Sequence, residues 1–201
     1  MSFDIRLAEP RDAAAIQAIY APFCESTAVS FEIAAPTVAE IAERIAKISL
    51  QHPWLVGELD GRVVGYVYAC PHRERAAYRW AVDVTVYIDA AHRQRGMGRA
   101  LYTGLFAILR GQNYFRAFAG ITLPNPGSVG VHEAMGFKPV AIYRNVGHKL
   151  GEWRDVGWWE LELQPLPAAP SEPIPFARFR HEPTLEAALA DGRRVWVDRN
   201  D

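Results

Sequence analysis

Residues 82–101 read Val-Asp-Val-Thr-Val-Tyr-Ile-Asp-Ala-Ala-His-Arg-Gln-Arg-Gly-Met-Gly-Arg-Ala-Leu. The first seven are rich in β-branched residues and alternate in polarity, which predicts a strand that ends near Asp89. A basic loop with two glycines follows, and a helix is expected to begin near Gly98. Such a junction leaves backbone N–H groups unpaired at the positive end of a helix. The stretch therefore predicts a strand–loop–helix unit that binds a polyanionic phosphate.

The glycine pattern narrows the kind of phosphate ligand. No Gly-Lys-Ser/Thr follows, so the loop is not of the kinase type, and Leu101 replaces the third glycine of a dinucleotide fingerprint. The pattern that does fit is Arg-x-x-Gly-x-Gly, formed by Arg93, Gly96 and Gly98. It is similar to the coenzyme A pyrophosphate loop of the GCN5-related N-acetyltransferases (GNAT).

Length and composition are those of an ordinary globular protein. A chain of 201 residues, 50% hydrophobic and 22% charged, suits one domain with a full core and a possible tail. A formal net charge of −1 argues against a nucleic-acid partner, and no run approaches membrane-spanning length. The N-terminus lacks a signal sequence, and Cys24 and Cys70 are expected to be reduced thiols rather than a disulfide or metal site. We therefore expect a cytoplasmic protein without a metal, a membrane anchor or a nucleic-acid partner.

Hydrophobic periodicity predicts alternating strands and helices. Asp60-Gly61 is a strong signal for a two-residue hairpin turn. Helices are expected after Asp12, from Thr37, from Gly98 to about Gly111, and through Met135. Strands are expected over residues 3–7, 54–59, 62–70, 82–88 and 115–122, and near 139–143 and 157–163.

The amino-acid composition of the chain changes at residue 165. Five prolines between positions 165 and 175 predict an extended linker, followed by a helix over 184–190 and an alternating stretch over 195–197. We divide the chain into a catalytic domain, residues 1–164, and a Pro-rich linker with a C-terminal arm, residues 165–201. The arm is expected to pack on the body or on a partner subunit; a disordered tail is the alternative, although Phe176, Phe179 and Trp196 are unusual in one.

The order of elements resembles the GNAT fold over about residues 3–163. Several short segments narrow the match to the phosphinothricin N-acetyltransferases and their methionine sulfone and sulfoximine acetyltransferase relatives. The resemblance implies an α/β fold of α+β type, with a mixed central sheet that is splayed at the acetyl-CoA site and flanked by helices. The segments are His52–Val56, Ala77–Trp80, Thr85–Ile88, His92–Gly98, Leu101–Thr103, Leu123–Asn125, Val131–Phe137, Gly147–Lys149 and Trp153–Trp159.

The resemblance also implies how acetyl-CoA is held. The loop amides would surround the pyrophosphate, Gly96 and Gly98 would let the backbone approach, and the loop arginines would match the phosphate charge. The central strand would offer backbone groups to the pantetheine arm, and one amide there would stabilise the oxyanion. The expected cofactor-binding residues are Val86, Tyr87, Ile88, Arg93, Gln94, Arg95, Gly96, Met97, Gly98, Arg99, Asn125 and Ser128.

Two residues are expected to be catalytic. Strand alternation places Asp83 on one face with Thr85 and Tyr87, and a carboxylate in an apolar strand is paired, capped or functional. We assign it as the general base for the amine, directly or through water, at a position where the family carries a glutamate. His132 stands where many acetyltransferases have a tyrosine and is assigned to the leaving thiolate or to the base role. A hydrogen-bonded strand aspartate and a structural histidine are the alternatives.

The substrate residues are assigned by position. Phe31, Arg73, Arg75 and Tyr78 are expected to contact the substrate, because an arginine fork suits a carboxylate, phosphinate or sulfone oxygen. His72 and Arg79 depart from the tryptophan and aspartate of the phosphinothricin enzymes, which leaves the amine open.

The predicted function is acetyl-CoA-dependent acetylation of the α-amine of a small amino acid or analogue, by direct attack in a ternary complex. The alternatives are another acceptor (a polyamine, an aminoglycoside or a protein N-terminus) and an acyl-CoA-binding module without turnover. The family resemblance implies a homodimer, with Trp153–Trp159 as a candidate contact or, alternatively, as buried core.

Overall fold

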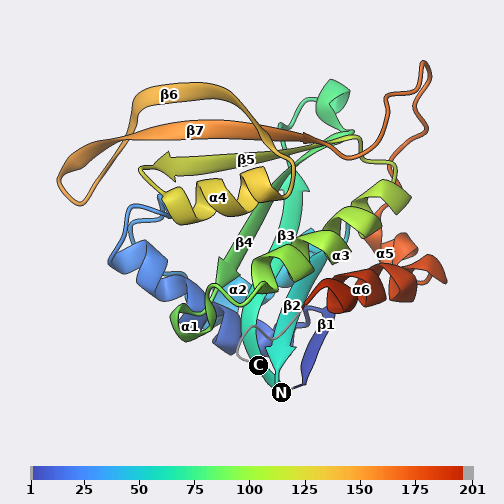
Figure 1. Cartoon of the computed structure of the whole chain (residues 1–201), viewed down its shortest axis with the longest axis horizontal. Helices are drawn as coiled ribbons and strands as arrows, with labels where there is room; N and C mark the ends of the chain where they lie inside the picture. The colour runs from blue at the N-terminus through green and yellow to red at the C-terminus, as the bar shows by residue number, and fades with distance from the viewer. Residues whose placement is uncertain (1, 197–201) are drawn as a thin grey trace.

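One mixed sheet organises the computed structural model, which describes residues 2–196 (Figure 1). Within those residues seven strands lie in the order β1-β2-β3-β4-β5-β7-β6. All neighbouring strands are antiparallel except β4 and β5, so the predicted mixed sheet is confirmed. The strands are β1 (Phe3–Leu7), β2 (Trp54–Leu59), β3 (Arg62–Pro71), β4 (Ala81–Ile88), β5 (Arg116–Leu123), β6 (Lys138–Lys149) and β7 (Glu152–Glu162).

The parallel pair β4–β5 separates after a short contact. Pairing joins residues 81–83 of β4 to residues 116–118 of β5 and stops there, although the strands continue to Ile88 and Leu123. On its other edge β4 stays paired with β3 along residues 82–88. The sheet is therefore splayed from Asp83 onward, as expected, and this opening positions the site.

Helices cover both faces of the sheet. The face of Val82 and Val84 packs against α3, whereas Tyr66 and Tyr87 pack on the opposite face with α1 and α2. The alternation predicted for the central strand is thus confirmed. The helices are α1 (Ala13–Glu25), α2 (Val38–Ile48), α3 (Met97–Gly111), α4 (Pro126–Ala134), α5 (Phe176–Phe179) and α6 (Thr184–Val195).

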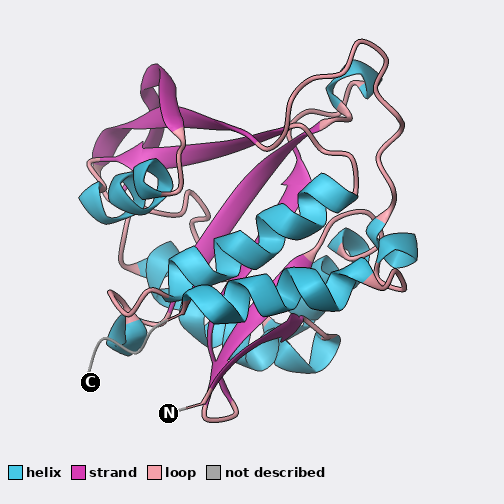
Figure 2. Cartoon of the chain, turned by 45° about the vertical axis from the view of Figure 1, so that its right-hand side comes forward, coloured by secondary structure: helices cyan, strands magenta, loops and turns pink. Residues whose placement is uncertain are grey.

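The segment after β7 returns to the body of the same chain. Figure 2 shows α6 beside α3, and Phe176 and Phe179 of α5 are buried in the main core. Arg193 pairs with Asp4 and donates to the carbonyl oxygen of Ile5 at 2.9 Å. Helix α6 runs five residues beyond the predicted end at 190, through Val195, and Val197 lies outside the described residues. The domain boundary at 164/165 stays a prediction.

The last hairpin differs most from the prediction. Strand β6 continues six residues beyond the expected end at 143, and β7 begins five residues before the expected start at 157. Almost all of β6 is exposed. Its side chains therefore need not alternate between apolar and polar, and this alternation is what predicts a strand from sequence. Two register shifts interrupt its pairing with β7, which weakens any period-2 pattern further.

Two further observations concern the described residues. None of their helices is long and apolar enough to cross a membrane. Cys24 is buried and Cys70 is partly buried, and both are free thiols.

Candidate active site

A cavity of about 640 Å³ opens where β4 and β5 diverge. Because β3 occupies one edge of β4, the alternate backbone groups of its other edge face this cleft, and no residue of β5 pairs with them beyond Asp83. The cleft is therefore lined by strand backbone on its two long sides. Its lining comes from β4 (Val84–Ile88), β5 (Ala119, Gly120, Ile121, Thr122), the loop and start of α3 (His92, Arg93, Gln94, Gly96, Met97, Gly98, Arg99), α4 and its cap (Asn125, Gly127, Ser128, Val131, His132), and Phe23 and Val29.

The loop before α3 is built to expose amides at one end of the cleft. Gly96 caps the helix with a φ of 80°, a left-handed conformation that glycine adopts without strain. Asp89 fixes the start of the loop, because one carboxylate oxygen accepts from the amide of Ala91 at 3.0 Å and lies 2.8 Å from Nδ1 of His92. The hydrogen bond from His92 lowers the pKa of Asp89. The loop therefore presents the positive end of α3 together with Arg93 and Arg99.

A second helix begins at the same cleft. The side-chain oxygen of Asn125 caps α4 by accepting from the amide of Ser128 at 3.1 Å, and Pro126 occupies the first helical position. Asn125, Gly127 and Ser128 all line the cavity. The positive ends of α3 and α4 thus face the same cavity, which suits a ligand that carries several negative charges.

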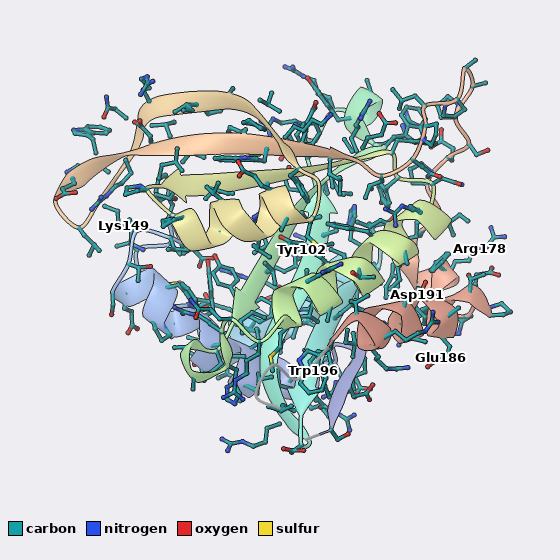
Figure 3. The ribbon with its side chains drawn as sticks, in the orientation of Figure 1. Tyr102, Lys149, Arg178, Glu186, Asp191 and Trp196 are labelled. Atoms are coloured by element: carbon teal, nitrogen blue, oxygen red, sulfur yellow. The ribbon has the colours of Figure 1, made fainter. Side chains whose placement is uncertain are left out.

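His132, about two turns after the Asn125 cap on α4, is buried and lines the cleft. Its Nδ1 lies 2.7 Å from the carbonyl oxygen of Ser128, so Nδ1 must carry the proton, and Nε2 then accepts from the hydroxyl of Tyr102 at 2.8 Å. Burial lowers the pKa of His132, which favours the neutral ring. Tyr102 lies on α3, which faces α4 (Figure 3).

Asp83 lies where the β4–β5 pairing ends. It is opposite Cys70 on β3 and Phe118 on β5, two residues before the cavity-lining Thr85. Its Oδ1 is 2.6 Å from Nδ1 of His72. Burial raises the pKa of Asp83, and the hydrogen bond from His72 opposes that shift. Because a carboxylate with a raised pKa binds a proton more readily than an ordinary one, Asp83 is suited to accept a proton.

A second cavity, of about 400 Å³, adjoins the first and shares Val29, Tyr87, Gly120 and Thr122 with it. Its remaining lining is Tyr20, Ser30, Phe31, Glu32 and Val156.

The loop over this second cavity is fastened from two sides. Lys149, at the end of β6 (Figure 3), is buried and donates to the carbonyl oxygens of Ser30 at 2.6 Å and Glu32 at 2.7 Å. Arg44 of α2 holds the Glu32 carboxylate with two hydrogen bonds, of 2.7 and 3.0 Å, which lowers the pKa of Glu32.

The cleft brings together most of the residues predicted for the cofactor, but not all of the predicted site. Arg95 is the one predicted cofactor residue outside the lining, and Asp83 lies just beyond it. Phe31 lines the second cavity. Arg73, Arg75 and Tyr78 line neither cavity and lie on the exposed segment that follows β3. The guanidinium of Arg73 lies 5.4 Å from the ring centre of Trp158.

Sequence reasoning missed several functional candidates. Phe23, Val29 and Thr122 line the cavities without belonging to a motif, and only the fold brings them together. Tyr102 had a detectable signal, since it lies in one of the family-like segments, but its hydrogen bond to His132 depends on helix packing. His72 was noticed only as a departure from the family and not as a partner of Asp83.

The described part of the chain offers no set of side chains suited to binding a metal ion. Residues 2–196 contain no cluster of three or more His, Cys, Asp or Glu side chains arranged to hold a metal ion.

Comparison with known proteins gives a consistent result. Residues 5–158 match the model of the acetyltransferase (GNAT) domain. The chain is 37% identical to a phosphinothricin N-acetyltransferase of Streptomyces viridochromogenes, over 85% of this chain and 94% of that protein. It is 33% identical to an L-methionine sulfoximine/L-methionine sulfone acetyltransferase of Salmonella typhimurium, over 79% of this chain and 94% of that protein. The crystal structure of a GNAT superfamily phosphinothricin acetyltransferase from Sinorhizobium meliloti in complex with acetyl-CoA superposes with a TM-score of 0.80 at 29% identity, covering 87% of this chain and 94% of that one.

Proposed function

The chain belongs to the GNAT acetyltransferase family, and from this premise we propose that it transfers the acetyl group of acetyl-CoA to the α-amine of a small amino acid or analogue. The acceptor class is that of phosphinothricin and methionine sulfoximine, the compounds named for its relatives. The observation that carries the proposal is the splayed cleft, with the N-terminus of α3 at its phosphate end and Asp83 just beyond its other end.

Acetyl-CoA fits the cleft by the chemistry of its lining. The amides from Gln94 to Arg99 and the side chains of Arg93 and Arg99 would hold the pyrophosphate. The unpaired edge of β4, Val86 to Ile88, would run beside the pantetheine arm, and an amide of this edge would receive the oxyanion. Asn125 and Ser128 would bound the same arm from α4. Acetyl-CoA supplies the reactive thioester, and the chain supplies its orientation.

Asp83 would take the proton that makes the amine nucleophilic. An α-ammonium group must lose one proton before its nitrogen can attack the thioester carbon. The C–S bond then breaks, and a second proton leaves the nitrogen as the amide forms, which balances the protonation of the departing thiolate. The burial that raises the pKa of Asp83 makes it a stronger base than an exposed aspartate.

His132 is proposed to serve the departing thiolate. It lines the cleft, and its neutral ring is held between Tyr102 and Ser128. A neutral imidazole is a weak acid, and both nitrogens of this one are already hydrogen-bonded. We therefore assign His132 to the wall of the cleft beside the sulfur, with the balancing proton coming from the amine.

The amine pocket is proposed to be the second cavity, with Phe31 as a wall. The exposed segment after β3 carries Arg73, Arg75 and Tyr78, and Tyr78 contacts His72, the partner of Asp83. The charge and hydroxyl of these residues would meet the carboxylate of an amino acid.

We propose that the protein is cytoplasmic, because free thiols such as Cys24 and Cys70 persist in that compartment.

We also propose a homodimer formed through the β6–β7 hairpin. Six large hydrophobic residues of the hairpin are exposed. Ile142→Arg should convert a dimer into a monomer in sedimentation velocity, and an unaltered protein that sediments as a monomer would refute the dimer. The six are Val140, Ile142, Tyr143, Val146, Leu150 and Trp153.

The proposed function is tested by a thiol-release assay with acetyl-CoA. The acceptors to compare are phosphinothricin, methionine sulfoximine, methionine sulfone, the common amino acids, a polyamine and an aminoglycoside. We expect turnover to be fastest with an amino acid or analogue, with an N-acetylated product in mass spectrometry. Faster turnover with the polyamine, or tight acetyl-CoA binding without thiol release for any acceptor, would refute it.

A further inference from the structure

His72 follows the end of β3 and folds back over the sheet beside Asp83. Its ring stacks on Phe118 of β5 with the ring centres 4.2 Å apart. Trp158 of β7 and Tyr78 meet the same ring edge-on, both at 5.9 Å between centres. Three aromatic contacts from three parts of the chain thus fix the plane of the imidazole, and its side chain is only 12% exposed.

The hydrogen bond that this ring makes has a defined direction. An ionised carboxylate only accepts, so Nδ1 of His72 carries the hydrogen and donates it to Oδ1 of Asp83, 2.6 Å away. A hydrogen bond to an ionised acceptor is short and strong. This one is also shielded from water, because only 25% of the Asp83 side chain is exposed. The rotation of the carboxylate is therefore restricted from one side.

The other carboxylate oxygen of Asp83, Oδ2, is available to accept a proton from a substrate. Within residues 2–196, Oδ2 of Asp83 receives no hydrogen bond from the protein. Phe118, which stacks on His72, is two residues before the cavity-lining Gly120, and Trp158 covers Gly120. The His72–Asp83 pair therefore lies at the end of the cavity, on the face of the sheet that carries Thr85 and Gly120. An amine in the adjoining cavity would approach Asp83 from this side.

We infer that His72 is the positioning residue of the acetyl transfer: by holding Oδ1 of Asp83 it presents Oδ2 to the amine that loses its proton. The inference rests on the proposed function, since it assigns a role within that reaction. Histidine suits the task because its aromatic ring packs between Phe118 and Trp158 while its nitrogen donates. A base whose orientation is fixed loses less activation entropy than one that rotates.

The pair has a predictable pH response. The titratable and charged groups nearest to it are Cys70 on β3, Arg73 on the following segment and Tyr78. On the far side Phe118 of β5 is paired with Glu160 of β7, which places that carboxylate on the same face of the sheet. Burial raises the pKa of Cys70 to about 12, so its thiol stays neutral below that range. Arg73 favours the Asp83 carboxylate. Loss of the hydrogen bond from His72 should therefore raise the pKa of Asp83 and move the acidic limb of the rate profile to higher pH.

Two variants separate the hydrogen bond from the packing. His72→Phe keeps a ring on Phe118 and removes the donor, whereas His72→Asn places an amide N–H near the position of Nδ1 and removes the ring's ability to carry a proton. We expect His72→Phe to lower kcat by about 10- to 100-fold, the usual effect of losing a supporting partner, with little change in KM for acetyl-CoA. His72→Asn should retain kcat to within about fivefold and keep the acidic limb in place, because the donor survives.

The titration of the Asp83 carboxyl carbon by NMR, assigned with Asp83→Asn, gives a readout independent of turnover. Its midpoint should rise in His72→Phe and stay in place in His72→Asn. Unchanged kcat, pH profile and titration in His72→Phe would overturn the inference, as would a His72→Asn variant as slow as His72→Phe, which would require the ring itself to carry the proton. Absence of turnover in the unaltered protein would instead refute the proposed function and the catalytic part of this inference, while the titration would still decide whether the hydrogen bond holds Asp83.

Discussion

At the residue scale, the proton transfer proposed for Asp83 is separable from cofactor binding. The cleft proposed for acetyl-CoA is lined by other residues, so a change at Asp83 leaves its lining intact. We expect Asp83→Asn to lower kcat at least about 100-fold, the scale of general-base catalysis, with the dissociation constant for acetyl-CoA within about threefold. Stopped-flow thiol release and calorimetry measure the two quantities.

The matched control is Asp191→Asn, which removes a half-buried carboxylate of α6 whose ion-pair partner among residues 2–196 is Arg194, at 3.0 Å. It should leave kcat unchanged. Equal rates for Asp83→Asn and the unaltered protein would contradict the assignment.

His52 couples stability to pH. Burial lowers its pKa from 6.5 to about 4 in the folded chain, so between these values the unfolded chain binds more protons. The free energy of unfolding should therefore decrease as pH falls from about 6.5 to about 4, by up to about 3 kcal/mol from this residue.

His52→Phe, which preserves a ring beside Tyr114, should flatten this dependence. Urea unfolding at pH 7 and pH 5 measures it. A variant that loses as much stability on acidification as the unaltered protein would show that His52 is not the source.

Residue chemistry was predictable from the sequence where it follows strand periodicity. The face of Asp83 follows from alternation, and the structure confirms that Val82 and Val84 pack on the opposite face. The His72–Asp83 hydrogen bond could not be predicted in this way, because it depends on how the chain turns after β3 and crosses towards β5.

At the scale of elements, the junction of β4 and α3 is sensitive to side-chain size. A Cβ at Gly98 would lie 3.5 Å from Val131, an ordinary contact, whereas a longer side chain would enter the cleft. Gly98→Leu should weaken acetyl-CoA binding by at least about tenfold, or about 1.4 kcal/mol.

Gly98→Ala is the matched control and should bind within about threefold of the unaltered protein, well under 1.4 kcal/mol. Calorimetric titration with acetyl-CoA measures both. If Gly98→Leu binds as tightly as Gly98→Ala, the pyrophosphate does not lie against this turn.

Element boundaries were predictable where one face is buried. Strands β2 and β3 and their Asp60-Gly61 turn agree with the sequence pattern, with φ values of 49° and 78° in the turn. The ends of β6 and β7 were not predictable, since the exposed hairpin extends past the buried sheet and turns at Leu150 and Gly151, both with positive φ.

At the scale of the whole molecule, the C-terminal segment packs onto the helix that starts at the phosphate loop. Gly192 of α6 lies so close to α3 that a Cβ there would come within 2.7 Å of the carbonyl oxygen of Ala100 and 2.8 Å of Ile5. Gly192→Val should therefore lower the free energy of unfolding by about 1–3 kcal/mol through overpacking. Urea unfolding measures the change.

Gly130→Ala is the control, because Gly130 is exposed on α4 and a Cβ there meets nothing within 4 Å. It should be neutral or stabilising by up to about 1 kcal/mol, as expected from helix propensity. Equal stabilities of the two variants would show that α6 does not stay on α3 in solution.

The sequence could indicate that the C-terminal segment has apolar residues to bury, but not which surface receives them. Phe179 covers Gly111 at the end of α3. Trp196, which follows α6 (Figure 3), stacks on Phe3 with ring centres 4.8 Å apart. Such contacts join residues more than 60 positions apart, which periodicity within one element does not encode.

The whole account depends on one placement: acetyl-CoA between β4 and β5, with its acyl carbon towards Asp83. A crystal structure of the complex with acetyl-CoA and a non-reactive amino acid analogue measures it directly. We predict the pyrophosphate on the amides from Gln94 to Arg99 and the nitrogen-equivalent atom of the analogue within hydrogen-bond reach of Asp83 or of a water bound to it. A cofactor bound outside the splayed cleft, or an analogue whose reacting atom faces away from Asp83, would contradict it.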